Sequence, residues 1–306
     1  MSDDAGQESR IGPYAIHEQL AEGGMAYVYR ATDLCSGDEV ALKVSRFAET
    51  DRRYGNALRF EADLLEQLDH PNIVKVLPIP LSGAKIPPYS AKALEVRGHP
   101  WYYAMEFLLG GVLIDYVEHG SALPVDVTCS VAYQIGRALL YLHERGYAHL
   151  DVKAENILFK YPLRKGALIQ PVLLDFGVAA QNKQGVETTG GTLLIMAPER
   201  LDRPDNGAQR HLDASKMDVY ALGVTCYRVL TGQYPFIGAT QRALISAILS
   251  SPVIPPSEVR PSIPGEVNML VLRCLEKDPT QRIGLREMVA YLERLPYRIS
   301  RLNRNL

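Results

Sequence analysis

The stretch His149-Leu150-Asp151-Val152-Lys153-Ala154-Glu155-Asn156, followed by Asp175-Phe176-Gly177, is the most informative part of the sequence. Asp151 can act as a base for a substrate hydroxyl, and Lys153 can offset the charge of a phosphate. Asn156 and Asp175 offer oxygen ligands, the type that Mg²⁺ prefers. Phosphoryl transfer from ATP needs such a set, because the protein mainly positions the reactants and stabilises charge on the moving phosphoryl group.

The two segments resemble the catalytic loop and the metal-binding motif of the eukaryotic-type (Hanks-type) serine/threonine protein kinase family. The stretches Glu22-Gly23-Gly24-Met25 and Val28-Tyr29 resemble the bacterial members of that family. The family signature reads H-R-D-x-x-x-x-N before D-F-G, and Leu150 stands where the family usually has Arg. The resemblance implies an α+β protein with the bilobal protein kinase fold, built from a small β-rich N-lobe and a larger α-helical C-lobe. It also implies a flexible N-terminal arm (1–13), the N-lobe and hinge (14–108), the C-lobe (109–295) and a basic C-terminal tail (296–306).

The pattern of apolar residues agrees with a β-rich front and a helical rear. Residues 27–31 and 40–44 are typical of strands, and the turn composition of 33–38 between them predicts a hairpin. Apolar residues at helical spacing predict one helix over 58–68 among the strands. Further helices are predicted over 125–143, 217–230, 241–249 and 267–275.

Two stretches, 78–100 and 161–171, are longer than the minimal form of the family and rich in Pro, Gly and Lys. We interpret both as surface loop insertions, with a docking role as the less favoured alternative.

Composition excludes several classes of protein. The chain has 306 residues and is 47% hydrophobic, which is enough for a large core. A net charge of -2 argues against a nucleic-acid partner held by broad phosphate contacts. No apolar run is long enough to span a membrane, and the four well-separated cysteines indicate reduced thiols in a cytoplasmic protein.

The segment before Val28 takes the place of the family's glycine-rich loop, in which glycine lets backbone N–H groups approach phosphates. Two of the three family glycines are Ala21 and Ala26 here, while Gly23 remains. Taken alone, an ordinary hairpin turn would explain the segment better. The resemblance implies that the nucleotide is bound by Lys43 and by Ala21, Glu22, Gly23, Gly24, Val28, Ala41, Met105, Glu106, Leu108 and Leu158.

Lys43 lies in an apolar strand, where an ammonium group is costly unless it meets an anion. The resemblance supplies two anions, the ATP phosphates and a glutamate of the following helix. Glu61 matches that glutamate by position. Glu66 is the alternative partner, but it lies about 140° further round the helix.

Three further features follow from the resemblance. Thr192 is expected to bond with Asp151 and Lys153, which supports the serine/threonine class. Glu199 and Arg282 are expected to form a structural ion pair. Asp218 is expected to anchor the backbone of the catalytic loop.

The function that these residues imply is an ATP- and Mg²⁺-dependent serine/threonine protein kinase, with Mn²⁺ as a possible replacement and a protein hydroxyl as acceptor. Leu150 cannot pair with a phosphorylated residue, so we expect activity to be independent of phosphorylation at Thr188 or Thr189 in the activation loop. The alternative is a pseudokinase or nucleotide-binding scaffold that acts through partners. A small-molecule phosphotransferase is disfavoured by Met196-Ala197-Pro198-Glu199, and the sequence gives no indication of the oligomeric state.

Overall fold

The computed structural model describes residues 9–46, 52–81, 83, 85–117, 122–181, 192–202 and 213–301. The chain divides into two compact units: the first comprises residues 1–69 and 74–107, and the second comprises residues 70–73 and 108–306. Within the described ranges, no helix combines the length and the apolar character needed to cross a membrane.

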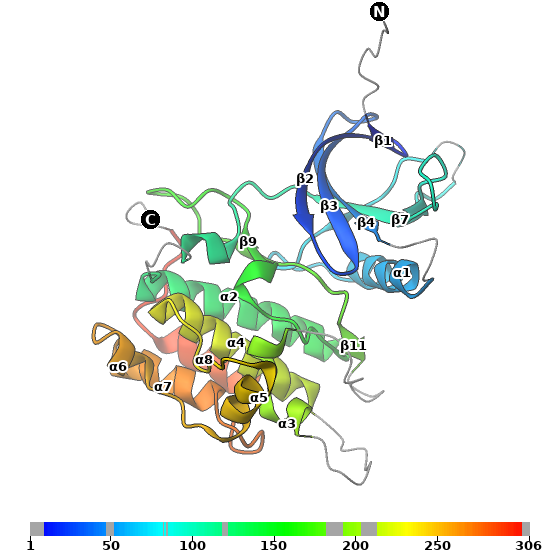
Figure 1. Cartoon of the computed structure of the whole chain (residues 1–306). Coiled ribbons are helices and arrows are strands. Elements are labelled where there is room, and N and C mark those ends of the chain that lie inside the picture. Colours follow the sequence, from blue (N-terminus) through cyan, green and yellow to red (C-terminus); the bar gives the residue numbers. More distant parts are fainter. Residues whose placement is uncertain are drawn as a thin grey trace, which may run out of the picture. The chain divides into compact units, whose positions relative to one another are not determined.

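A curled antiparallel sheet forms most of the first unit (Figure 1). Its strands follow the order β1-β2-β3-β4-β7-β5, and β6 pairs with the same edge of β7 as β5 does. The predicted hairpin joins β3 to β4, since the Asp33 N–H donates to the Asp38 oxygen at 2.9 Å. The strands are β1 (Arg10–Ile11), β2 (Tyr14–Glu22), β3 (Ala26–Asp33), β4 (Glu39–Ser45), β5 (Val76–Leu77), β6 (Ala91–Lys92) and β7 (Trp101–Glu106).

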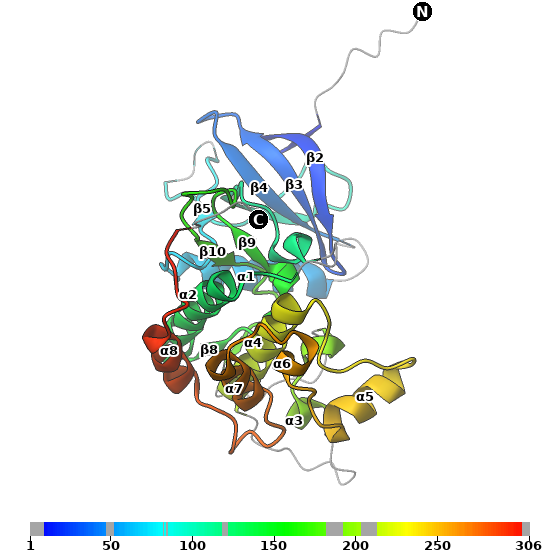
Figure 2. The same cartoon turned by 90° about the vertical axis from the view of Figure 1, so that its left-hand side faces the viewer.

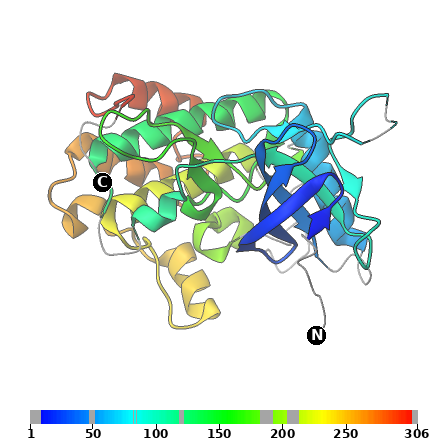
Figure 3. The same cartoon turned by 90° about the horizontal axis from the view of Figure 1, so that it is seen from above.

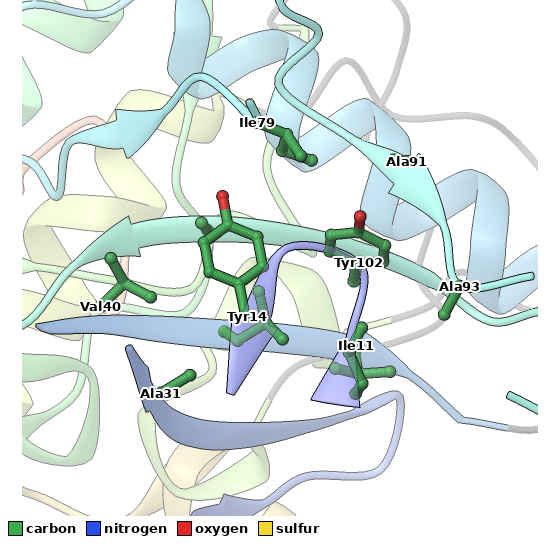
Figure 4. Packing of buried hydrophobic residues seen from close by; sticks show 11 residues of the cluster. Ile11, Tyr14, Ala31, Val40, Ile79, Ala91, Ala93 and Tyr102 are labelled. Atoms are coloured by element: carbon green, nitrogen blue, oxygen red, sulfur yellow. The ribbon is translucent and has the colours of Figure 1, made fainter. Parts of the chain in front are cut away.

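One face of this sheet carries the apolar core of the unit. Alternate residues point to opposite faces of a strand, so Val40, Leu42 and Val44 of β4 lie together in the core. Figure 4 shows the rings of Tyr14 and Tyr102 side by side, and their centroids are 6.2 Å apart in an edge-to-face arrangement. This packing fixes the pairing register of the strands. The register in turn decides which residues lie on the face of the sheet opposite the core.

The helix α1 (Arg52–Glu66) is the one long helix described in the first unit. It begins earlier than the predicted range 58–68 and ends two residues before Leu68. Its buried stripe consists of Leu58, Ala62 and Leu65, at the spacing of one helical face.

Two expectations for the first unit were wrong. The arm expected over 1–13 is too long, because β1 pairs with β2 and Ile11 is buried in the core. The segment 78–100 is more than a surface loop, since Ile79, Ala91 and Ala93 belong to the core cluster and β6 pairs with β7. These three isolated apolar residues form no periodic pattern among the Pro and Gly residues of the segment, so the sequence did not predict their burial.

Helices dominate the second unit, and α4 (Ala214–Thr231) lies among its neighbours α2, α6, α7 and α8 (Figure 2). The end of α4 is set by Gly232, whose φ of +79° suits glycine in a left-handed C-terminal cap. Figure 3 shows α8 running alongside α2. The other helices are α2 (Val125–Glu144), α3 (Pro198–Leu201), α5 (Gln241–Ser250), α6 (Pro256–Val259), α7 (Gly265–Cys274) and α8 (Leu285–Arg294).

All four helices predicted for this region are present, with ends shifted by a few residues. The helix α8 was not predicted. The α+β class, with a β-rich first unit and a helix-rich second unit, is confirmed.

Short strands and 3₁₀ turns carry the loops of the second unit. The strands β9 (Ile157–Phe159) and β10 (Pro171–Leu173) pair antiparallel, as do β8 (Tyr147–Ala148) and β11 (Ala180–Gln181). The 3₁₀ turns are η1 (Leu113–Tyr116), η2 (Ala154–Asn156) and η3 (Leu193–Ile195).

The expectation of a plain surface loop over 161–171 was also wrong. Leu163 and Ile169 are buried, and Gln134 of α2 donates to the Ile169 oxygen at 2.8 Å. The expected C-terminal tail also contacts this segment, since the Ile169 N–H donates to the Ser300 oxygen at 2.9 Å. The described part of that tail therefore packs as part of the unit.

Candidate active site

In the first unit, Lys43 of β4 and Glu61 of α1 form an ion pair. Lys43 Nζ lies 2.7 Å from both carboxylate oxygens of Glu61. The side chains are 13% and 2% exposed, so the pair is largely shielded from water. Glu66, the alternative partner, is exposed on another side of the helix. The prediction that Glu61 and not Glu66 pairs with Lys43 is thus confirmed, and α1 holds a carboxylate at the lysine.

Four of the expected nucleotide-binding residues of the sheet share one face with Lys43, namely Ala21, Val28, Ala41 and Met105. In an antiparallel sheet, direct partners lie on the same face. Val28 pairs with Lys43 and with Ala21, while Ala41 pairs with Met105 and lies two residues from Lys43. This face is opposite to the one that forms the apolar core. The sheet therefore groups these side chains without burying them in that core.

Glu22, Gly23 and Gly24 lie at the tip of the β2–β3 hairpin. The Gly23 N–H donates to the Ala26 oxygen at 2.9 Å, and Arg46 donates to the Gly23 oxygen at 2.8 Å. The Glu22 carboxylate also pairs with Arg46, at 2.9 Å. A Cβ added to Gly24 would have no neighbour within 4 Å, and neither glycine has a positive φ. The packing of the hairpin does not by itself require glycine at Gly24.

The residues expected at the hinge span the end of the first unit and the start of the second. Met105 is buried in β7. The Glu106 N–H donates to the Lys75 oxygen at 2.9 Å, so this donor is already used within the first unit. Leu108 is buried in the second unit, where the half-buried Leu158 of β9 bridges to Val112.

In the second unit, Asp218 of α4 holds the start of the catalytic loop. Its carboxylate accepts from the N–H groups of His149 and Leu150 at 2.9 and 2.7 Å, and it lies 2.8 Å from His143 Nε2. Burial alone would raise the pKa of Asp218, but the bond and charge of His143 and the nearby His149 outweigh it and lower the pKa. The expected anchoring role of Asp218 is therefore present in the structure.

The catalytic loop gathers its polar side chains around Asp151. This carboxylate lies 2.8 Å from Lys153 Nζ and accepts from Asn156 Nδ2 at 2.9 Å and from the Thr192 N–H at 3.1 Å. Lys153 also donates to the Thr192 hydroxyl at 2.6 Å. Thr192 thus bonds with both residues, as predicted, using its N–H for Asp151 and its hydroxyl for Lys153. The result is a nearly buried carboxylate held by three donors.

Two residues of this region have backbone angles that are rare outside glycine. Leu150 has φ +66° and Asp175 has φ +62°. Such a conformation costs about 1–3 kcal/mol per residue and persists only where surrounding contacts enforce it. At Leu150 the enforcing contact is the bond from its N–H to Asp218.

Asp175 is held close to Asn156 by backbone contacts of its neighbours. The Leu174 N–H donates to the Asn156 oxygen at 2.9 Å, and the Leu174 oxygen lies 3.0 Å from His149 Nε2. Phe176 is fully buried, with its ring 4.7 Å from the His149 ring. The two expected metal ligands therefore lie on adjoining backbone segments.

These two residues fit a hard divalent cation such as Mg²⁺. Asn156 uses its amide nitrogen for the Asp151 backbone oxygen and carboxylate, so its amide oxygen is the atom that would ligate a metal. Asp175 would add a carboxylate oxygen. The described residues contain no group of three or more His, Cys, Asp or Glu side chains that could hold a metal. Two protein ligands suffice where phosphate oxygens and water complete the shell.

Arg200 was not singled out from the sequence. It is buried, and its Nη1 donates to the Leu150 oxygen at 3.5 Å. Burial lowers the pKa of Arg200, while the charges of Asp151 and Asp218 act in the opposite direction. A cation therefore lies near the catalytic loop even though Leu150 replaces the usual Arg. No local signal could have revealed it, because its position depends on how α3 packs.

His143 was also missed, although a histidine in the last turn of a helix was a usable hint. The expected ion pair of Glu199 and Arg282 is confirmed, with bonds of 2.7 and 2.8 Å between buried side chains. Thr188 and Thr189 lie outside the described residues.

Comparison with known proteins agrees with this geometry. The family model described as protein kinase domain matches residues 14–292. The chain is 29% identical over 276 residues to the serine/threonine-protein kinase PrkC of Bacillus subtilis, covering 89% of this chain and 38% of PrkC. It is 30% identical over 272 residues to the serine/threonine-protein kinase PknB of Mycobacterium leprae, covering 88% of this chain and 40% of PknB.

A crystal structure of Rad53 1-466 in complex with AMP-PNP superposes with a TM-score of 0.69 at 25% identity, covering 94% of this chain and 66% of that one. The chain spans about two fifths of the length of the two bacterial relatives. With a family model matched over most of its residues, the chain belongs to the protein kinase domain family.

Proposed function

We propose that the chain is an ATP-dependent serine/threonine protein kinase that transfers the γ-phosphoryl group to a protein hydroxyl. The observation that supports this most is the cluster of Asp151, Lys153, Asn156 and Thr192, in which one carboxylate meets a lysine, an amide and a backbone donor. The names of PrkC and PknB, and the AMP-PNP bound to Rad53, support the same activity and the use of ATP.

The second unit would carry out the transfer. Asp151 orients the acceptor hydroxyl and takes its proton as the oxygen bonds to the γ-phosphorus and the bond to ADP breaks. Lys153 offsets the charge of the moving phosphoryl group, and Thr192 holds Lys153 and Asp151 in position. Asn156 and Asp175 would hold Mg²⁺, or Mn²⁺ in its place. The metal would supply neutralisation of phosphate charge.

The first unit would hold the nucleotide by its phosphates. Lys43, kept in place by Glu61, is suited to pair with phosphate oxygens. Gly24 needs no glycine for its own packing, so the close approach of a phosphate is a physical reason for glycine there. Glu106 would offer the adenine its carbonyl, since its N–H is used by Lys75. The remaining adenine contacts are assigned to Val28, Ala41, Met105, Leu108 and Leu158. Ala21, Glu22 and Gly23 are assigned, with Gly24, to the loop that approaches the phosphates.

We also propose that turnover does not require phosphorylation of the activation loop. Leu150 has no charge to pair with a phosphate, and Arg200 already supplies a cation near the catalytic loop. Turnover of phosphatase-treated protein should match that of untreated protein, and Thr188→Ala/Thr189→Ala should retain activity. Loss of activity in both would reject the idea.

For the domain bounds, we propose an N-lobe with its hinge that begins at β1 and ends at residue 108, and a C-lobe that begins at residue 109 and includes the described part of the tail. We expect a protein substrate with Ser or Thr, no nucleic-acid partner, and action in the cytoplasm, where reduced thiols such as the exposed Cys35 persist.

Incubation with γ-labelled ATP and Mg²⁺ tests the activity. Asp151→Asn should lower incorporation of label into a protein acceptor by about 10²–10⁴-fold, because the base is lost while the shape is kept. Asp63→Asn is the matched control, since Asp63 is an exposed carboxylate of α1. Label in the wild type and in Asp63→Asn, but not in Asp151→Asn, supports the kinase. Label in none of the three supports a nucleotide-binding scaffold.

A further inference from the structure

Trp101, the only tryptophan of the chain, links the strand that bears Lys43 to the helix that bears Glu61. It is the first residue of β7. Its backbone N–H donates to the Ser45 hydroxyl at 2.9 Å, and Ser45 is the buried last residue of β4, two positions after Lys43. The backbone of Trp101 is therefore tied to the strand of the lysine.

The indole ring of Trp101 lies against α1 at Gly55. A Cβ added to Gly55 would lie 2.6 Å from the ring Cδ1 and 3.3 Å from Nε1. Glycine inside a helix is unfavourable compared with alanine, so its presence needs a local reason. Here the reason is steric, because the indole occupies the space that a Cβ would take.

Two cations hold the same ring. The guanidinium of Arg59, one turn after Gly55, lies 4.5 Å from a ring centroid, and Lys92 Nζ lies 5.5 Å away. Both distances suit cation–π attraction. Lys92 belongs to β6, which pairs with β7 directly opposite Trp101. The segment 78–100 thus supplies one side of the site that fixes the ring.

The place where Trp101 contacts the helix, at Gly55, explains how it can affect Glu61. At 100° per residue, Gly55 and Glu61 lie about 120° apart, on the two edges of the buried stripe of Leu58, Ala62 and Leu65. A contact that fixes one edge limits the rotation of the helix about its axis. It therefore also fixes the direction in which Glu61 points, toward Lys43.

We propose that Trp101 is a positioning residue, which clamps α1 on the sheet and keeps Glu61 paired with Lys43. Its effect on phosphoryl transfer rests on the proposed kinase function. Its effect on α1 does not, because it depends only on packing within the first unit.

Gly55→Ala and Trp101→Ala test the clamp from both sides, with Asn56→Ala as the matched control at the next, exposed position of the helix. Hydrogen–deuterium exchange of 58–66 is the first measurement, and acrylamide quenching of Trp101 is the second. Helix propensity alone predicts that Gly55→Ala slows exchange roughly fourfold. The clamp predicts the opposite, with exchange at least about tenfold faster in Gly55→Ala and Trp101→Ala. Quenching should rise in Gly55→Ala, and Trp101→Phe should restore part of the protection.

Kinase turnover then separates the two proposals. With labelled ATP, Gly55→Ala and Trp101→Ala should lose about 10–100-fold in kcat, while Asn56→Ala keeps the wild-type rate. Exchange in 58–66 that stays unchanged or slows in both variants would overturn the clamp, whatever the turnover. Wild-type protein without any turnover would instead count against the kinase function and leave the exchange result to decide the clamp.

Discussion

In the first unit, Lys43 and Glu61 meet through side chains of a strand and a helix, whereas in the second unit Asp218 holds the catalytic loop by two backbone N–H groups. The first arrangement depends on how α1 packs on the sheet. The second lies inside a helical core, where the Asp218 side chain has no exposure. A site held by backbone bonds in a core should be hard to displace, while one held by packed side chains can be moved by a single contact.

The largest difference expected between the units is in thiol reactivity. Cys35 is exposed in the first unit, whereas Cys129, Cys226 and Cys274 are buried in the second. Burial raises the pKa of Cys129 and Cys274 to about 12, and only a thiolate reacts readily. Cys35 should react with iodoacetamide at once, and the other three at least about 10³-fold more slowly, because their exposure requires unfolding.

Mass spectrometry of the alkylated protein checks this prediction cysteine by cysteine. Rapid modification of any second cysteine in the native protein would contradict the picture of a closed helical core. The rate at which the three buried cysteines are alkylated also measures the stability of the second unit. The fluorescence of Trp101 measures unfolding of the first unit.

Removing the anchor of the catalytic loop should have the next largest effect. Asp218→Ala leaves the N–H groups of His149 and Leu150 without their acceptor in a buried site. We expect a loss of about 3–5 kcal/mol in the free energy of unfolding of the second unit. Thiol labelling should accelerate accordingly, while the Trp101 transition in urea stays in place. Equal effects from the control Asp63→Ala would show that the loss has another cause.

The ion pair of the first unit should contribute less. Glu61→Gln keeps the shape of the side chain but removes the negative charge that pairs with Lys43. Because Lys43 is 13% exposed, water can compensate in part. The expected loss is about 2 kcal/mol, seen as an earlier Trp101 transition in urea. Glu66→Gln, on an exposed position of the same helix, should have almost no effect, and a comparable shift there would contradict the assignment.

Much of this site could be predicted, because its residues sit in short motifs of fixed order. The contacts of Lys43 with Glu61, of Asp151 with Thr192, of Asp218 with the catalytic loop and of Glu199 with Arg282 were predicted in this way. The contact of Trp101 with Gly55 could not be predicted, since the two residues are far apart in the sequence and neither is part of a motif.

The segments 78–100 and 161–171 were wrongly predicted to be surface loops for a related reason. Pro and Gly suggested loops, while Ile79 and Ile169 reveal their burial only when the neighbouring elements are in place. Arg200 is a similar case, because its charge matters through the carboxylates around it and not through its sequence neighbours.

The smallest effect at neutral pH is expected from His143→Gln. The glutamine amide can donate to Asp218 in place of the imidazole, so the loss should stay below about 1 kcal/mol at pH 7.

At acid pH the difference should grow, because the charge of His143 lowers the pKa of Asp218 and glutamine carries no charge. Asp218 has a lowered pKa when folded, so its stabilising effect is complete above the unfolded value of about 4 and is lost as the pH falls through the folded value. Without the charge of His143, burial is opposed mainly by His149, so the folded pKa of Asp218 should be higher than in wild type and the loss should begin at higher pH. To measure this, the protein is incubated at a pH between 5 and 2.5 and then returned to neutral pH for a short pulse of thiol labelling. The buried cysteines of His143→Gln should become labelled at a higher incubation pH than those of wild type. Coincident acid transitions would mean that the charge of His143 does not hold the pKa of Asp218 down.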